Sequence, residues 1–203
     1  MNDIKKKILQ NKKKDFIEVY NNKKRDLARK NIFNKIRRYN GPGLVQIVKS
    51  SKALDMVLFE TNAVTGEKKL DIPEDIIYRL DYSNVDFDSA NIRGINFTGM
   101  YNVHINPQTI FNKDMRGTVL FGTYIIGRFD DVYITHADFR GSEGVLIDPQ
   151  TIYDRDLRYA NLADAIVVDD FHDIKTEGMN KEGAYFITRK EKEMIYGFQK
   201  NKI

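Results

Sequence analysis

The three histidines are the side chains of this chain best suited to proton transfer or to binding a metal ion. They are His104, His136 and His172. Zinc sites are usually marked by closely spaced ligands, as in HxH or HExxH, and neither pattern occurs in these 203 residues, which include no cysteine. Asp169, Asp170 and Asp173, beside His172, form the densest polar cluster. We interpret this cluster as a solvated segment, with an ion or contact site as the alternative.

Motifs that mark other kinds of active site are also missing. The chain has no G-x-S-x-G nucleophile motif, no P-loop and no dinucleotide-binding fingerprint. Its glycines are spaced like turn residues, which favours corners of the backbone over phosphate binding. The relevant glycines are Gly94, Gly99, Gly117, Gly122 and Gly141. We therefore expect a protein that is not an enzyme and that uses no cofactor and no metal.

Basic residues are concentrated at the start of the chain. Residues 1–40 contain 14 Lys and Arg against four acids, whereas the formal charge of the whole chain is only +4. Nucleic-acid binding by this basic head is one functional hypothesis, because lysine and arginine contact phosphates. The residues that would do so are Lys12, Lys13, Lys14, Lys23, Lys24, Arg25, Arg37 and Arg38. The alternative is a solubilising helix pair, or a head that packs on the more acidic remainder.

The elements that follow are organised by an internal repeat. Residues 87–123 align with residues 129–165 at an offset of about 42, and the match includes PQTI at 107–110 and 149–152. Within each copy an apolar residue recurs every fifth position, as at Phe87, Ile92 and Phe97. A period of five fits neither a helix nor a strand. It indicates a chain that turns a corner every five residues and points one side chain of each segment inward.

The five-residue units follow the pattern A-(D/N)-(L/F)-x-G, as in ANIRG, INFTG, KDMRG, ADFRG, RDLRY and ANLAD. In this the chain resembles the pentapeptide-repeat family, over about 90 residues. Its INPQTI and IDPQTI cassettes are similar to those of repeat proteins from low-GC Gram-positive bacteria and their mobile elements. The resemblance implies a mainly β fold, a right-handed quadrilateral β-helix of about four to five coils. It implies no activity, because one fold serves many functions.

Four regions are predicted along the chain. Residues 1–40 form a basic helical extension of two helices, the second starting near Asn22, and residues 41–80 form short strands and an N-terminal cap. Residues 81–173 form the repeat, and residues 174–203 a C-terminal cap helix with Thr188 at its start. This helix would cover the open end of the repeat or pair with a second copy. Members of the family often dimerise through that end, so we also expect a homodimer there.

Two insertions interrupt the five-residue spacing, YNVH at 101–104 and EGVL at 143–146. They should project from the same corner of the repeat and form an exposed pair of loops. We expect Tyr101, Asn102, Glu143 and Gly144 to contact a partner. Lys113 and Arg155 would be costly to bury, so the chain should open there and let them reach water. The main functional hypothesis is a non-enzymatic scaffold that docks its faces and corner loops on an unidentified protein.

A third hypothesis comes from the acidity of the repeat. Residues 81–170 contain about 14 acids against seven bases, and some pentapeptide-repeat proteins mimic DNA and so inhibit or protect an enzyme such as gyrase. The basic head argues against this hypothesis. No apolar run approaches the roughly 20 residues of a membrane span, and the basic start has no signal-peptide core. We therefore expect a cytoplasmic protein without a membrane partner.

Overall fold

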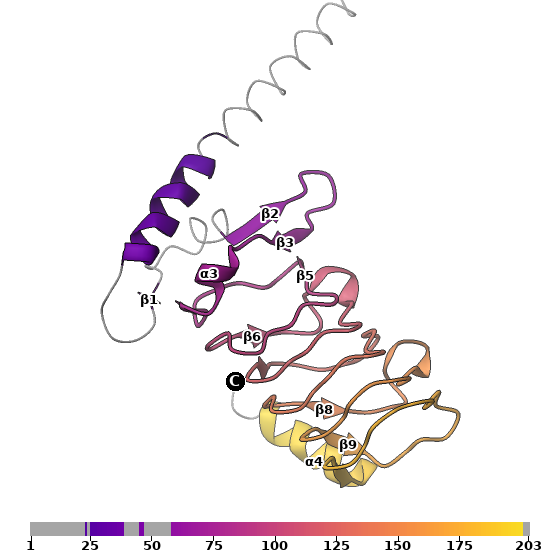
Figure 1. The fold of residues 1–203 in the computed structure, drawn as a ribbon. Helices are drawn as coiled ribbons and strands as arrows, with labels where there is room; N and C mark the ends of the chain where they lie inside the picture. Colours follow the sequence, from indigo (N-terminus) through magenta and orange to yellow (C-terminus); the bar gives the residue numbers. More distant parts are fainter. Residues whose placement is uncertain (1–22, 24, 39–44, 47–57, 201–203) are drawn as a thin grey trace, which may run out of the picture. The chain divides into compact units, whose positions relative to one another are not determined.

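The computed structural model describes residues 23, 25–38, 45–46 and 58–200 of the chain (Figure 1). The chain divides into two compact units, Met1–Val45 and Gln46–Ile203. In the first unit, residues 25–38 form a helix. Phe33 and Ile36 of this helix are buried. The helix predicted to start near Asn22 is thus confirmed over the described residues, whereas the helix predicted before it lies outside them.

A short strand, β1 (Val45–Gln46), spans the point in the chain where the first unit ends, and a hairpin follows in the second unit. Strands β2 (Phe59–Thr61) and β3 (Lys68–Leu70) are antiparallel. Their turn is held by Asn62, whose side-chain oxygen accepts hydrogen bonds from the backbone N–H groups of Val64 and Thr65. Helix α3 (Glu74–Ile77) follows, with Pro73 at its start. These elements lie within residues 41–80, where short strands and an N-terminal cap were predicted.

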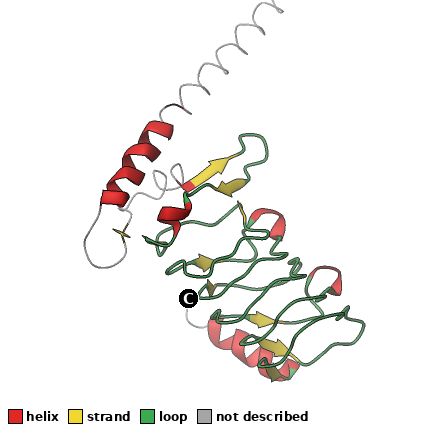
Figure 2. Ribbon diagram, in the orientation of Figure 1, coloured by secondary structure: helices red, strands yellow, loops and turns green. Residues whose placement is uncertain are grey.

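The rest of the second unit is built from very short strands separated by turns (Figure 2). These strands are β4 (Leu80–Asp81), β5 (Ala90–Asn91), β6 (His104–Ile105), β7 (Tyr124–Ile125), β8 (Leu146–Ile147), β9 (Ile166–Val168) and β10 (Tyr185–Ile187). They pair in parallel with the chain roughly 20 residues further on, as when Val119 pairs with Asp138. We call each stretch of about 20 residues between successive pairings a layer.

The predicted fold class, a right-handed quadrilateral β-helix, was wrong. Apart from β4, the described strands from β2 onward belong to small separate sheets, β2-β3-β5, β6-β7 and β8-β9-β10. Most other pairings between layers are isolated bridges. The cause is the backbone, because left-handed residues recur through the repeat, at glycines and at residues such as Ser89, His136 and Asp164. A strand cannot continue through a left-handed residue, so each ends after two or three residues.

The five-residue periodicity did identify the core correctly. All the apolar residues that it places inside the second unit from Phe87 to Val167 are buried. These are Phe87, Ile92, Phe97, Ile105, Ile110, Met115, Leu120, Ile125, Phe129, Ile134, Phe139, Ile147, Ile152, Leu157, Leu162 and Val167. Phenylalanines of one layer meet edge to face, with ring centroids 5.8 Å apart for Phe87 and Phe97 and 5.5 Å for Phe129 and Phe139. Each buried side chain of this size contributes about 1.5–3 kcal/mol.

Two 3₁₀ turns lift charged residues out of this core. The turns are η1 (Phe111–Lys113) and η2 (Tyr153–Arg155), and each ends on a residue with φ of 49°. Arg155 is exposed. Lys113 is half-buried, and its ammonium donates a hydrogen bond of 3.4 Å to the carbonyl oxygen of Asp130. The expectation that the chain opens here to spare these charges is confirmed.

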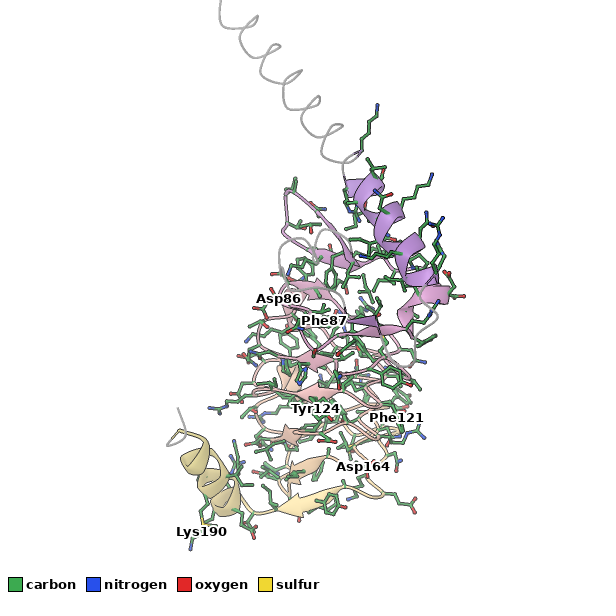
Figure 3. The ribbon with its side chains drawn as sticks, turned by 90° about the vertical axis from the view of Figure 1, so that its left-hand side faces the viewer. Asp86, Phe87, Phe121, Tyr124, Asp164 and Lys190 are labelled. Carbon is green, nitrogen blue, oxygen red and sulfur yellow. The ribbon has the colours of Figure 1, made fainter. Side chains whose placement is uncertain are left out.

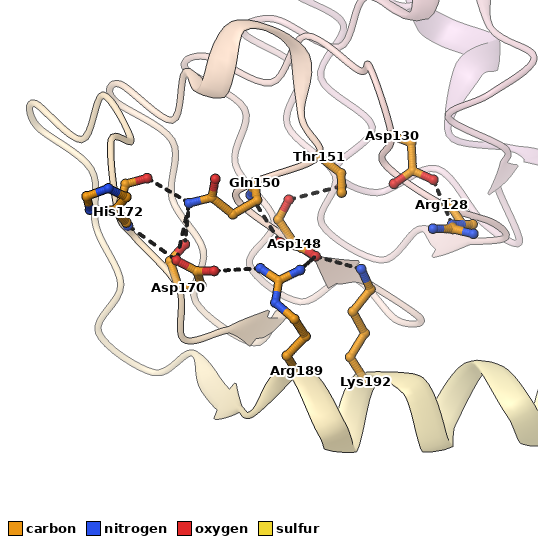
Figure 4. Close-up of polar contacts among 9 residues, drawn as sticks. All are labelled: Arg128, Asp130, Asp148, Gln150, Thr151, Asp170, His172, Arg189 and Lys192. Carbon is orange, nitrogen blue, oxygen red and sulfur yellow. Dashed lines mark hydrogen bonds and ion pairs between the residues drawn. The ribbon is translucent and has the colours of Figure 1, made fainter.

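Helix α4 (Arg189–Lys200) follows β10. Thr188 caps it reciprocally, because the Thr188 hydroxyl accepts from the Glu191 N–H at 3.3 Å and the Glu191 carboxylate accepts from the Thr188 N–H at 2.7 Å. The predicted cap is confirmed. The first turns of α4 bind Asp148 and Asp170, which belong to the layers of β8 and β9 (Figure 4). The helix therefore lies beside these layers, and Phe186 in the last layer remains 43% exposed.

Candidate protein-interaction surface

The parallel register places the two predicted loops on one face of the second unit. Tyr101 pairs with Asp81 of the preceding layer. In the next layer, Tyr124 pairs with His104 on one side and with Glu143 on the other. The loop at 101–104 and the loop at 143–146 therefore flank strand β7. The structure brings the predicted loops to the same face, with Tyr124 between them.

Two of the four predicted contact residues shape the loops. Asn102 has a φ of 59°, and its side-chain amide donates a hydrogen bond of 2.9 Å to Asp81. This bond, helped by one from the Ser83 N–H, holds the pKa of Asp81 below its ordinary value. Gly144 has a φ of 76°, and a Cβ there would lie 2.4 Å from the carbonyl oxygen of Ile125. Asn102 and Gly144 thus permit the turns that leave the other two predicted residues, Tyr101 and Glu143, exposed.

Large apolar side chains are exposed around these loops. Their exposed fractions are 51% for Tyr101, 53% for Phe121, 38% for Tyr124 and 57% for Ile126. Figure 3 shows Phe121 and Tyr124 at a similar level of the stacked layers. We call these four residues the aromatic face. Single exposed apolar residues are common on proteins, whereas larger contiguous patches of them mark interaction sites.

Two of these rings are held in place by their neighbours. The Phe121 ring lies so close to Gly141 that a Cβ there would come within 2.6 Å of it. The Tyr124 ring stacks on the His104 ring, with centroids 5.1 Å apart and an angle of 18° between the planes. Both rings are thus fixed with one side toward solvent, which lowers the entropy that a partner must remove on binding.

A shallow hollow adjoins the aromatic face at Phe121. It has a volume of about 230 Å³ and is lined by Thr98, Val119, Phe121, Asp138 and Arg140. At its rim, the Arg140 guanidinium lies 2.5 Å from the Asp138 carboxylate. Partial burial raises the pKa of Asp138, but the hydrogen bonds and charge of Arg140 outweigh it and hold the pKa below its ordinary value. The hollow therefore combines an apolar wall with an ion pair at its rim, as protein interfaces commonly do.

The histidines occupy separate places. His104 stacks on Tyr124, and His136 stacks on Tyr159 with centroids 4.7 Å apart. The Nε2 atom of His172 lies 3.1 Å from the Asp173 carboxylate. Over the part of the chain that the structure describes, no group of three or more His, Cys, Asp or Glu side chains is arranged to hold a metal ion.

Within the polar cluster predicted near residue 170, His172 and Asp173 are exposed, as expected of a solvated segment, whereas Asp170 contacts α4. Asp170 accepts a hydrogen bond of 2.5 Å from Arg189 of α4 (Figure 4). The Gln150 amide connects the same segment, because it donates to the Asp170 carboxylate at 3.2 Å and to the His172 carbonyl oxygen at 2.7 Å. Asp148 accepts hydrogen bonds from Arg189 and Lys192. Asp148 and Asp170 therefore hold α4 against the layers of β8 and β9.

A second and larger hollow, of about 710 Å³, lies on another part of the repeat. Its lining includes Arg128, Asp130, Asp154, Arg155, Asp173 and Lys175. Arg128 lies 2.7 Å from Asp130, and Lys175 lies 2.5 Å from Asp154. Because charges of both signs pair with each other here, the hollow offers no field of one sign for a charged ligand.

The residues predicted to bind nucleic acid are only partly described. Lys23, Arg37 and Arg38 are exposed and Arg25 is half-buried, all on helical residues of the first unit. Lys12, Lys13, Lys14 and Lys24 lie outside the described residues.

Comparison with known proteins gives no match to this chain. No family model, no curated protein and no solved structure matches it. The pentapeptide-repeat resemblance therefore stays a hypothesis that depends on the five-residue motifs alone. Among the described helices, none is both long and apolar enough to cross a membrane.

Sequence reasoning missed three of the four residues of the aromatic face, although a signal for them existed. Tyr124 and Ile126 flank Ile125, which the five-residue period assigns to the core. Their side chains must therefore point outward, and an apolar residue at an outward position is informative. Phe121 follows inward-facing Leu120 in the same way. The predicted loops include Tyr101 but not Phe121, Tyr124 or Ile126.

Proposed function

We propose that this protein is a non-enzymatic scaffold that binds another protein through the aromatic face. The observation that carries this proposal is the exposure of Tyr101, Phe121, Tyr124 and Ile126 around the two loops. Aromatic side chains are enriched at the centres of protein interfaces, where a few anchors supply most of the binding energy. Tyrosine is well suited to this role because its ring is apolar and its hydroxyl can still find a polar partner.

The neighbouring layers support the same conclusion. Ile126, Asp148 and Val168 occupy equivalent positions in three layers. Each directly follows a core residue, which is Ile125, Ile147 or Val167, and the last two layers are those of β8 and β9. Asp148 and Val168 are buried, and α4 binds at Asp148, whereas Ile126 is exposed. This side of the repeat thus already accepts one helix from its own chain, and its uncovered part is available to a partner.

The arrangement of charges does not favour DNA mimicry. A mimic needs a regular row of negative charges in place of phosphates. In this repeat the aspartates at regular positions pair with the arginine two residues later. These pairs are Asp114 with Arg116, Asp138 with Arg140, and Asp156 with Arg158. Neutralised carboxylates of this kind would not imitate a DNA backbone.

The proposal is tested by affinity capture from a Gram-positive lysate with the wild-type protein and the double variant Phe121→Ser/Tyr124→Ser. We expect the wild type to retain a discrete protein, and the double variant to lose it while keeping its melting temperature within a few degrees. The matched control is Tyr153→Ser, which removes an exposed aromatic ring that is not part of the aromatic face. Equal retention by the wild type and the double variant would exclude the aromatic face as the docking surface.

A nuclease-treated sample separates this function from its main alternative. Protein docking on the aromatic face survives nuclease, because no nucleic acid is involved. Binding through the basic residues of the head would disappear with nuclease and would weaken steeply with salt. Capture that depends on nucleic acid would therefore assign the function to residues 1–40.

A further inference from the structure

The last layer has an exposed lysine at the position where the earlier layers have an inward-facing side chain. Asn180 pairs with Asn161, and the Leu162 N–H donates to the Asn180 carbonyl oxygen. In the same way, the Leu120 N–H donates to the Asp138 carbonyl oxygen and the Phe139 N–H donates to the Asn161 carbonyl oxygen. In each case the residue after the acceptor is the next member of the inward-facing column. Residue 181, which follows Asn180, therefore has the position in the last layer that Leu162 has in the layer before. The earlier members of this column are Phe97, Leu120, Phe139 and Leu162, all fully buried. Lys181 is the next member.

The ammonium of Lys181 lies over the open end of the core. Its Nζ atom is 5.4 Å from the centroid of the Phe171 ring and 5.7 Å from that of Phe186. The two rings meet at 63° with centroids 6.2 Å apart. Phe186 remains 43% exposed, and Phe171 is half-buried. The side chain therefore covers aromatic surface with its stem while its charge stays in contact with solvent.

The edge of strand β10 is open at the same end. In the sheet β10-β9-β8, β9 lies between the other two strands, so β10 is an edge strand. No described residue pairs with its outer side. An open edge beside half-exposed core residues is a surface on which a second copy could stack. Proteins prevent such stacking by placing a charged side chain that points inward at the edge.

We propose that Lys181 is an end stop, which keeps a second copy of this chain from joining at the open end of the repeat. In a two-fold symmetric contact the same surface meets itself, so each copy would bring its Lys181 into the interface. Both ammonium groups would lose water between apolar rings, which is costly unless each charge finds a partner. This inference opposes the homodimer expected at the C-terminal end, and it does not depend on the proposed function.

The test compares the self-association of the full chain with that of Lys181→Leu. This variant has at position 181 the same residue type as Leu162, its counterpart in the preceding layer. Lys175→Leu is the matched control, since it removes the same charge from an outward position in the same layer, where Lys175 pairs with Asp154. Sedimentation velocity over a wide concentration range gives the association constant of each protein. We expect Lys181→Leu to associate at least about tenfold more strongly than the other two, which corresponds to about 1.4 kcal/mol.

Each result decides the matter. Stronger association of Lys181→Leu than of both the wild type and Lys175→Leu supports the end stop. No increase, or an equal increase in Lys175→Leu, overturns it. Lys181→Met serves as a second variant if Lys181→Leu does not fold, because methionine keeps the long stem and removes only the charge.

Discussion

The ammonium of Lys192 donates a hydrogen bond of 2.6 Å to the carboxylate of Asp148, 44 residues earlier in the chain, and both side chains are buried. Asp148 also accepts a hydrogen bond from the Gln150 N–H at 3.0 Å and pairs with Arg189 at 3.3 Å. A buried pair of this kind contributes little net stability, because removing both charges from water is costly. It does fix position, so the pair sets where α4 lies on the layers of β8 and β9.

Breaking this pair on one side should be strongly destabilising. Lys192→Met leaves the Asp148 carboxylate buried without its closest cation, and we expect the free energy of unfolding to fall by about 3–5 kcal/mol. The double variant Asp148→Asn/Lys192→Met should recover most of this loss. Urea denaturation measures both changes. Arg158→Gln, at the more exposed Asp156–Arg158 pair, is the control and should change stability far less. A similar loss in all three variants would mean that the buried pair has no special role.

The position of the Phe121 ring should depend on Gly141. Gly141→Ala places a methyl group 2.6 Å from that ring, so the ring must move. The substitution also strains the backbone, because the φ of this residue is 63°. Gly94→Ala is the matched control, because Gly94 has a φ of 70° and open space around it. The control should lose about 1–2 kcal/mol from strain alone. We expect Gly141→Ala to lose more, and to reduce capture of the partner, whereas Gly94→Ala should retain it.

The middle and the end of the core should differ in how much an aromatic ring contributes to stability. Phe139 is fully buried in the middle of the repeat, and Phe139→Ala should cost about 3–5 kcal/mol. Phe186 lies 43% exposed in the last layer. Phe186→Ala should therefore cost roughly 1 kcal/mol or less, since a half-exposed ring has less apolar surface to lose. Equal losses, measured by urea denaturation, would show that the last layer is covered in solution.

The core could be predicted from the sequence because its signal is periodic. Apolar residues such as Ile92, Met115 and Leu157 belong to a series with five-residue spacing, and neither a helix nor a strand has that period. The strands could not be predicted in the same way. Whether an isolated bridge extends into a strand depends on the φ angle of corner residues such as Ser89 and His136. These residues are not glycine, so the sequence gives no clear signal that their backbone is left-handed. The step from a period to a named β-helix therefore went too far.

The candidate site was predictable only in part, for a different physical reason. The insertions at 101–104 and 143–146 break the period, so the loops could be located. The contribution of Tyr124 depends on pairings between layers, which place it between His104 and Glu143. The burial of Asp148 depends on α4, more than 40 residues later in the chain. Long-range contacts of this kind leave no local pattern in a single sequence.

Stability should fall in acid through the aspartates that pair with arginine. Arg158 donates hydrogen bonds to Asp156 and lowers the pKa of that carboxyl below its ordinary value of 3.8. Burial raises the pKa of Asp114, but the hydrogen bonds and charge of Arg116 outweigh it, and the net direction is again downward. The folded state therefore binds protons less readily than the unfolded state does. This contribution is fully present above the unfolded pKa and is lost as pH falls through the folded pKa.

We thus expect the urea midpoint to change little near neutral pH and to drop progressively below about pH 4. Asp114→Asn removes one of these groups, so it should lower stability near neutral pH and make the drop in acid shallower. Asp131→Asn is the control, because this exposed aspartate has no arginine two residues later. Its midpoint should follow the wild type at every pH. If Asp114→Asn and the wild type lost stability in parallel below pH 4, the Asp114–Arg116 pair would not contribute to acid unfolding.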